Sequence, residues 1–88
     1  MCKHREVVQS ARYDNQLAAI ESDARTADQT THAVAWALAR QPERGFGIPG
    51  TPWSIWPVYI RGEEYVVYYT FDDYRVELVA VIPSTAEL

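Results

Sequence analysis

The strongest strand signal in this chain is the stretch Tyr65-Val66-Val67-Tyr68-Tyr69-Thr70-Phe71. Every residue in it is β-branched or aromatic, and these are the residue types that favour strands. Asp72-Asp73-Tyr74 then reverses the chain, and residues 75–82 form the next predicted strand, which Pro83 ends. The sequence therefore predicts an antiparallel pair of strands between residues 65 and 82.

A third predicted strand, at residues 53–60, precedes this pair. The four residues at 61–64, Arg-Gly-Glu-Glu, have the length of a hairpin turn. Pro57 has no backbone N–H to donate to a neighbouring strand, so this segment is predicted to be an edge strand or a bulged one. Six Pro and Gly residues between positions 42 and 52 exclude regular structure there and predict one long loop.

Upstream of this loop the apolar residues follow a helical period. One stripe of an amphipathic helix is formed by Tyr13, Leu17, Ile20 and Ala24. This spacing predicts a first helix over residues 11–25. The polar residues 28–31 offer N-caps for a second helix, which contains the run at 33–39 and ends near Arg40. The paired valines within residues 5–9 favour one short additional strand.

These elements predict a single α+β domain over residues 1–88. The predicted order is (β)ααβββ, with two N-terminal helices packed on one face of a small antiparallel sheet. Alternation assigns the core face of the last two strands to Tyr65, Val67, Tyr69, Phe71, Val76, Leu78, Ala80 and Ile82. It assigns the opposite face to Val66, Tyr68, Thr70, Arg75, Glu77, Val79 and Val81.

The opposite face is unusually apolar. Four of its seven residues are apolar, which is more than the solvated face of a small monomer usually shows. Either a partner covers this face, or a C-terminal tail or scattered surface residues account for it. Trp53 and Trp56 are three positions apart, so we expect one in the core and the other beside Tyr68. The predicted partner-binding residues are Trp56, Val66, Tyr68, Thr70, Val79 and Val81.

The charge of the chain is unevenly distributed. Its 88 residues have a net charge of −4, and residues 51–88 carry all of it, with Arg61 and Arg75 as their only basic residues. Because general nucleic-acid binding relies on Lys and Arg neutralising phosphates, we expect no such binding. A single cysteine and the lack of an apolar run of about 20 residues predict a soluble cytoplasmic protein with no membrane segment.

The residues that usually hold metals are scattered in the sequence. Cys2 and His4 lie near the N-terminus and His32 begins the second predicted helix, so their spacing is not that of a zinc site. The acidic pairs Glu63-Glu64 and Asp72-Asp73 lie in predicted turns, where such residues commonly serve turn formation. We therefore expect no metal and no cofactor.

Three segments together suggest a family. Leu38-Ala39 is followed by Pro42-Glu43-Arg44-Gly45, which is similar to a helix end and a Pro-x-x-Gly loop. The Tyr65 to Tyr69 segment is similar to a Tyr-Arg-Val-x-Tyr strand, and residues 75–82 match a last strand. In this order the chain resembles the RelE/ParE superfamily, the toxins of bacterial type II toxin–antitoxin systems.

The resemblance implies a cytoplasmic toxin that inhibits growth, contributes to plasmid stabilisation and is neutralised by a cognate antitoxin protein encoded beside it. Such toxins act in two ways. Some cleave mRNA on the ribosome, using Arg and Lys residues on the exposed sheet face, and others bind DNA gyrase. The resemblance thus offers the ribosome or gyrase as the target.

The chain departs from the pattern of the cleaving toxins. Val66 stands where the family often has Arg, Thr70 occupies another commonly basic position, and no basic residue follows Ile82. The remaining candidates for catalysis are Arg44, Arg61, Arg75 and Tyr68. We therefore expect a toxin that binds a protein target such as gyrase. The alternatives are a ribosome-dependent mRNA endonuclease of the same family and a non-toxic protein-binding module, including one that forms a homodimer.

Overall fold

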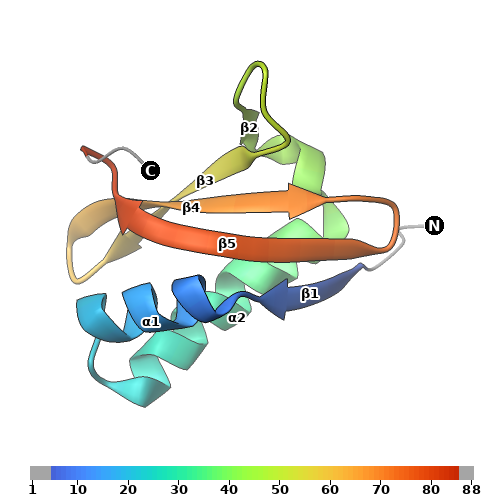
Figure 1. The fold of residues 1–88 in the computed structure, drawn as a ribbon. Coiled ribbons are helices and arrows are strands. Elements are labelled where there is room, and N and C mark those ends of the chain that lie inside the picture. Colours follow the sequence, from blue (N-terminus) through green and yellow to red (C-terminus); the bar gives the residue numbers. More distant parts are fainter. Residues whose placement is uncertain (1–4, 86–88) are drawn as a thin grey trace.

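Five strands form one sheet in the order β1-β5-β4-β3-β2, and two helices cover one of its faces (Figure 1). This computed structural model describes residues 5–85. Strand β1 is parallel to β5, and the other neighbouring pairs are antiparallel. The elements are β1 (Glu6–Gln9), α1 (Ala11–Ile20), α2 (Ala24–Arg40), the 3-10 turn η1 (Pro42–Arg44), β2 (Phe46–Gly47), β3 (Ser54–Ile60), β4 (Glu63–Phe71) and β5 (Arg75–Pro83).

The predicted α+β class and the order of the predicted elements are confirmed. The prediction that residues 42–52 lack regular structure is wrong, because η1 and the two-residue strand β2 lie there. The boundary between the helices is also earlier than predicted. The first helix ends at Ile20 rather than near residue 25, and the second begins at Ala24. Asp23, which the helical stripe places inside the first helix, is the N-cap of α2. Its carboxylate accepts hydrogen bonds from the Arg25 backbone N–H and the Thr26 hydroxyl, both at 3.1 Å. Asp23 thus starts α2, whereas α1 has already ended at Ile20 with Glu21 as its C-cap.

The core lies between the helices and the covered face of the sheet. Its fully buried members include Tyr13 and Leu38 from the helices and Val67, Tyr69 and Leu78 from the sheet. The Tyr13 hydroxyl forms a 2.9 Å hydrogen bond with the Thr31 hydroxyl, so the polar end of this ring is satisfied within the core. The helices and the meander are therefore held by one shared apolar layer.

A β-bulge in β5 corrects the predicted assignment of its two faces. Tyr68 lies opposite Ala80 while Tyr69 lies opposite Leu78, so Val79 is an extra residue in the ladder. An extra residue reverses the alternation for the rest of the strand. Val81, predicted for the exposed face, is instead opposite Val67 in the core and 1% exposed. Ala80 and Ile82, predicted for the core face, pair with Tyr68 and Val66 on the other face.

The predicted loop after α2 is tied to the sheet by Tyr69. Its hydroxyl donates a hydrogen bond to the backbone carbonyl of Pro42, at the start of η1. Gly45 passes so close to this ring that a Cβ there would overlap the Tyr69 hydroxyl and lie 2.8 Å from the Ile55 carbonyl oxygen. This contact lies directly before β2 in the chain.

Candidate functional site

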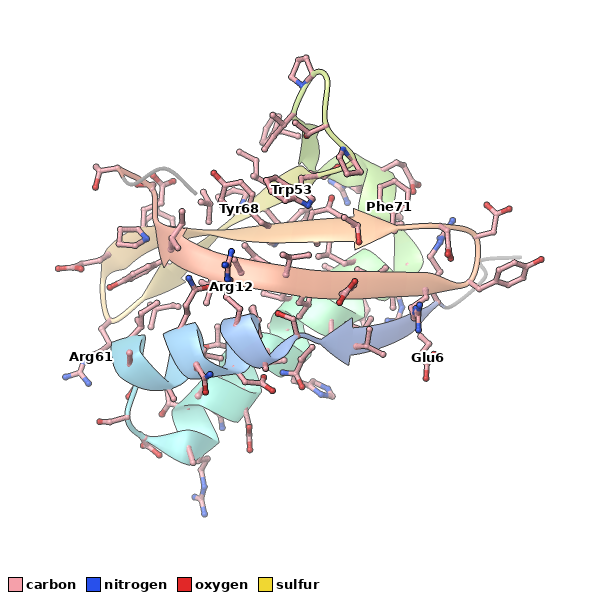
Figure 2. All side chains as sticks on the ribbon, viewed as in Figure 1. Glu6, Arg12, Trp53, Arg61, Tyr68 and Phe71 are labelled. Carbon is pink, nitrogen blue, oxygen red and sulfur yellow. The ribbon has the colours of Figure 1, made fainter. Side chains whose placement is uncertain are left out.

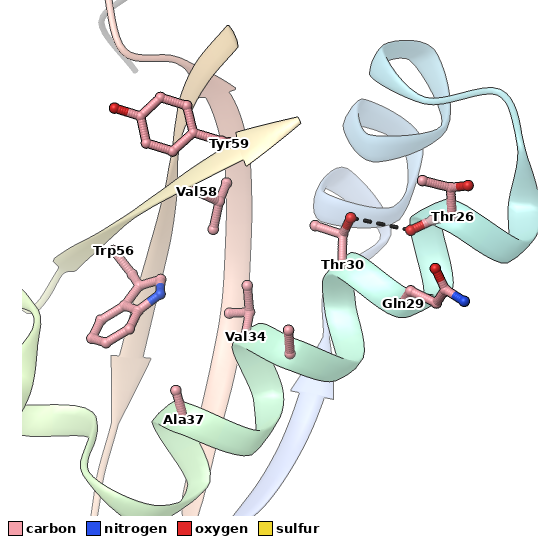
Figure 3. Close-up of a pocket in the computed structure, with 9 residues that line it drawn as sticks. Thr26, Gln29, Thr30, Val34, Ala37, Trp56, Val58 and Tyr59 are labelled. Atoms are coloured by element: carbon pink, nitrogen blue, oxygen red, sulfur yellow. Dashed lines mark hydrogen bonds between the residues drawn. The ribbon is translucent and has the colours of Figure 1, made fainter. Parts of the chain in front are cut away.

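A groove separates α2 from β3 (Figure 3). Its volume is about 390 Å³, and it is lined by Thr26, Gln29, Thr30, Ala33, Val34, Ala37, Trp56, Val58 and Tyr59. Small alanine side chains on the helix leave this space open, because a methyl group does not reach the strand. Trp56 and Val58 point toward α2, and the ring of Tyr59 lies on the other side of the strand (Figure 3).

The strand beside this groove has an open edge. Strand β2 pairs only with Ser54 and Ile55, so within residues 5–85 no strand pairs with residues 56–60 of β3 on that side. On the same side of the strand, just before β3 begins, the Trp53 carbonyl accepts a hydrogen bond from the Ile48 N–H. Because the backbone groups of a strand alternate in direction, those of Pro57 and Tyr59 point the same way, away from β4.

Pro57 is therefore located where a proline costs least. Pro57 lies opposite Val66 of β4. An N–H at this position would point to the open edge and not to β4, so its absence removes no hydrogen bond between the two strands. Residues 53–60 were predicted to form an edge strand or a bulged one, and the edge position is confirmed for the second half of β3, beyond its pairing with β2. The edge offers the N–H and carbonyl of Tyr59 and the carbonyl of Pro57 to an incoming chain.

A smaller hollow continues the groove at the C-terminal end of α2. It has a volume of about 220 Å³ and shares Ala37 and Trp56 with the larger groove. Its other lining residues are Trp36, Arg40, Gln41 and Arg44. The Arg40 guanidinium lies 4.1 Å from the centre of the Trp36 ring, and Arg44 donates a 3.1 Å hydrogen bond to the Gln41 side-chain carbonyl. This end of the groove is cationic and aromatic.

The uncovered face of the sheet carries a second aromatic cluster. Trp53 and Tyr68 meet edge to face, with ring centres 6.1 Å apart, and both labels lie together in Figure 2. The predicted partner-binding residues Val66 and Thr70 are on this face too, half-buried. Val79 is half-buried at the bulge. Their roles in binding stay predictions.

Trp56 does not belong to that face, which corrects its predicted position. It lies opposite Val67 and packs against the core on the side of α2, and Trp53 occupies the place beside Tyr68. The spacing of the two tryptophans correctly separates them between the faces. It does not say which residue goes where, because the long loop leaves the register of β3 undetermined by sequence.

The four catalytic candidates are not brought together. Arg61 is in the turn before β4, where it adopts a positive φ of 54° and forms a 3.5 Å ion pair with the buried carboxylate of Glu21. Arg75 follows the turn after β4, and this strand has nine residues, so the two arginines are separated by about 30 Å. Figure 2 shows Arg61 and Phe71 at opposite ends of the sheet.

The surroundings of Arg75 are acidic. It lines a small depression with Glu77 and Asp72. Backbone N–H groups of Tyr74 and Arg75 donate to the Asp72 carboxylate, at 2.8 Å each, and they hold the pKa of this carboxyl below its usual value. Arg44 is the last residue of η1 and lines the hollow with Arg40, and Tyr68 is near the middle of β4. The three candidate arginines are therefore not gathered around Tyr68.

The described residues contain no group of three or more His, Cys, Asp or Glu side chains suited to a metal ion. Cys2 and His4, considered as ligands from the sequence, lie outside the described residues. Between residues 5 and 85, neither helix has the length and apolar character needed to cross a membrane.

Comparison with known proteins supports the fold. No protein-family profile matches the chain, and no curated protein matches its sequence. A solved structure described as the chromosomal ParDE TA system from P. aeruginosa contains a similar chain, with a TM-score of 0.60 and 12% sequence identity. The match covers 92% of this chain and 97% of that chain. The predicted RelE/ParE-like fold is thereby confirmed.

Proposed function

We propose that this chain is the toxin of a type II toxin–antitoxin system and that an antitoxin segment binds along the groove between α2 and β3. The likeness to a chain of the ParDE TA system, over nearly the full length of both chains, is the observation that carries this proposal. In this proposal the protein acts in the cytoplasm and inhibits growth when the antitoxin is absent.

The groove suits a polypeptide better than a small molecule. It is elongated along α2, apolar in its middle, and bordered by the unpaired backbone groups of Pro57 and Tyr59. An extended chain that pairs with such an edge satisfies these backbone groups and places alternate side chains in the groove. An antitoxin segment bound in this way would form the sixth strand of the sheet.

We further propose that the target is a protein such as DNA gyrase. RNA cleavage at a 2′-hydroxyl needs a base, an acid and cations that stabilise the negative charge of the transition state. Arg61 is paired with Glu21, and Arg75 is beside Asp72 and Glu77, at the other end of the sheet. This separation favours the protein target over the ribosome-dependent nuclease.

Controlled expression in bacteria tests the proposal. Induction of the protein alone should stop growth, and co-expression of the protein encoded by the adjacent reading frame should restore it. Purified gyrase should lose supercoiling activity in the presence of the protein, and cellular transcripts should stay intact. Transcripts cut at codons would instead support the nuclease. Normal growth after induction without any antitoxin would contradict the toxin function and favour a non-toxic binding or dimerisation module.

A further inference from the structure

The hollow at the C-terminal end of α2 holds two guanidinium groups with no carboxylate partner among the described residues. Within residues 5–85, the ion pair closer than 4 Å joins Arg61 and Glu21, far from this hollow. Arg40 donates instead to the Trp36 carbonyl at 2.9 Å, and Arg44 donates to Gln41. Each of these bonds uses one of the five N–H donors of a guanidinium. Both side chains therefore keep donors for an anion.

The position of Arg40 is fixed before any ligand arrives. Its guanidinium is stacked 4.1 Å from the centre of the Trp36 ring, and the same side chain is anchored to the backbone one helical turn earlier. A cation held over an aromatic ring loses little freedom when it binds an anion. Trp56 forms the wall shared with the apolar groove. A ligand that fits both parts has an anionic group beside apolar groups.

We infer that this hollow receives an acidic side chain, Asp or Glu, of the antitoxin segment bound along β3. The inference rests on the proposed function, and it adds the chemistry of one position of the partner. The carboxylate would accept hydrogen bonds from Arg40 and Arg44, and the neighbouring residues of the segment would be apolar where they contact Trp56 and Ala37. Arg44, a catalytic candidate in the sequence, thereby becomes a specificity residue.

A nucleic acid also combines negative charge with flat rings, but the rest of the surface does not suit it. The chain has a net charge of −4, and the basic residues of its C-terminal half are beside acidic ones. A strand of nucleic acid needs a basic track for its phosphates. The groove that leads away from the hollow is neutral and is bordered by a strand edge, which matches the backbone of a peptide.

The inference can be tested with a random library of peptides about 12 residues long, which is longer than the groove. The library would be selected against the full chain, and peptides that no longer bind a Tyr59→Pro variant would be assigned to the groove. These peptides should share one acidic position. Replacing that residue by its amide should weaken binding to the wild type about tenfold, the effect expected for hydrogen bonds to a charged group.

Two arginine variants of the protein test which side chains bind the acidic residue of the peptide. In the Arg40→Gln/Arg44→Gln variant the acidic peptide and its amide should bind equally well. In the Arg25→Gln variant, changed at the other end of α2, the tenfold difference should remain. Circular dichroism should give the same spectrum for all three proteins, since these arginines are at the surface. An undiminished difference in Arg40→Gln/Arg44→Gln would overturn the inference, as would a groove-binding set without an acidic position.

Two further outcomes are informative. A mixed-sequence RNA of about 12 nucleotides that binds through Arg40 and Arg44 more tightly than the acidic peptides would overturn the inference in favour of nucleic acid.

Growth arrest and its relief by the antitoxin are measured separately from peptide binding. If an antitoxin relieves the arrest equally well after its acidic residues are replaced by amides, the inference about the hollow is overturned and the toxin function stands. If the peptides show the acidic preference but the protein does not arrest growth, the inference is supported and the toxin function is contradicted.

Discussion

Gly45 shows how one residue connects the loop after α2 to the sheet. Its lack of a side chain lets the backbone pass the Tyr69 hydroxyl, which donates to the Pro42 carbonyl. We expect Gly45→Ala to lower the free energy of unfolding by about 1–3 kcal/mol, because the new methyl group overlaps a buried ring. Urea unfolding measures this change. Gly47→Ala is the matched control, since a Cβ at Gly47 meets no atom within 4 Å, and an equal loss there would contradict this account.

Two tyrosines make the stability sensitive to alkaline pH. Burial raises the pKa of Tyr13 and the pKa of Tyr69 above the usual value of 10.0. Because the folded pKa lies above the unfolded one, these groups contribute stability that is complete below pH 10 and is lost as the pH rises toward the folded pKa. The free energy of unfolding should therefore fall above pH 10.

Urea unfolding across this pH range checks the tyrosine prediction. The Tyr13→Phe variant has one fewer group to titrate, so its free energy of unfolding should fall less steeply with pH than that of the wild type. Tyr59→Phe is the control, because Tyr59 is 72% exposed. A wild-type curve that is flat above pH 10 would contradict the burial of the two hydroxyls.

Among the elements, the junction between α1 and α2 depends on one cap. Asp23 accepts hydrogen bonds at the first turn of α2. Asp23→Ala should lower the free energy of unfolding by about 1 kcal/mol, the usual effect of losing an N-cap. Thermal unfolding measures it, with the exposed Asp28→Ala in the same helix as control. Equal melting temperatures of Asp23→Ala and the wild type would show that the cap does not determine this boundary.

The elements also separate what the sequence could predict from what it could not. Strands β3, β4 and β5 were predictable because β-branched and aromatic residues fill them and turn residues divide them. The bulge at Val79 was not, because residues 78–82, Leu-Val-Ala-Val-Ile, are apolar in either phase of the alternation. The predicted positions of Trp56 and Val81 were wrong because the sequence determines neither the register of β3 nor the bulge in β5.

The groove was equally hidden in the sequence. Its space results from alanines on α2 facing a strand that is about 20 residues later in the chain, and no local pattern reports that distance. Helical spacing of Ala33 and Ala37 shows only that both share one face of α2. The hollow with Arg40 was missed for the same reason, since only the fold brings Trp56 to it.

At the scale of the whole molecule, the distribution of charge bears on which target the proposed toxin acts on. The net charge is −4, and Arg61 and Arg75 are at opposite ends of the sheet. A toxin that binds a protein target does not require both, so the Arg61→Ala/Arg75→Ala variant should still arrest growth after induction. The measurement is the growth rate with the amount of soluble protein matched to the wild type. Loss of arrest at matched amounts would favour RNA cleavage.

The central claim is that an antitoxin segment pairs with the open edge of β3, and growth after co-expression with the adjacent-frame protein tests it most directly. Tyr59→Pro removes the N–H that faces the groove and leaves the bonds between β3 and β4 in place, whereas Tyr59→Ala keeps that N–H. We predict that the wild type and both variants arrest growth when expressed alone, and that the antitoxin relieves the arrest by the wild type and Tyr59→Ala but not by Tyr59→Pro. Equal relief of all three would contradict the claim.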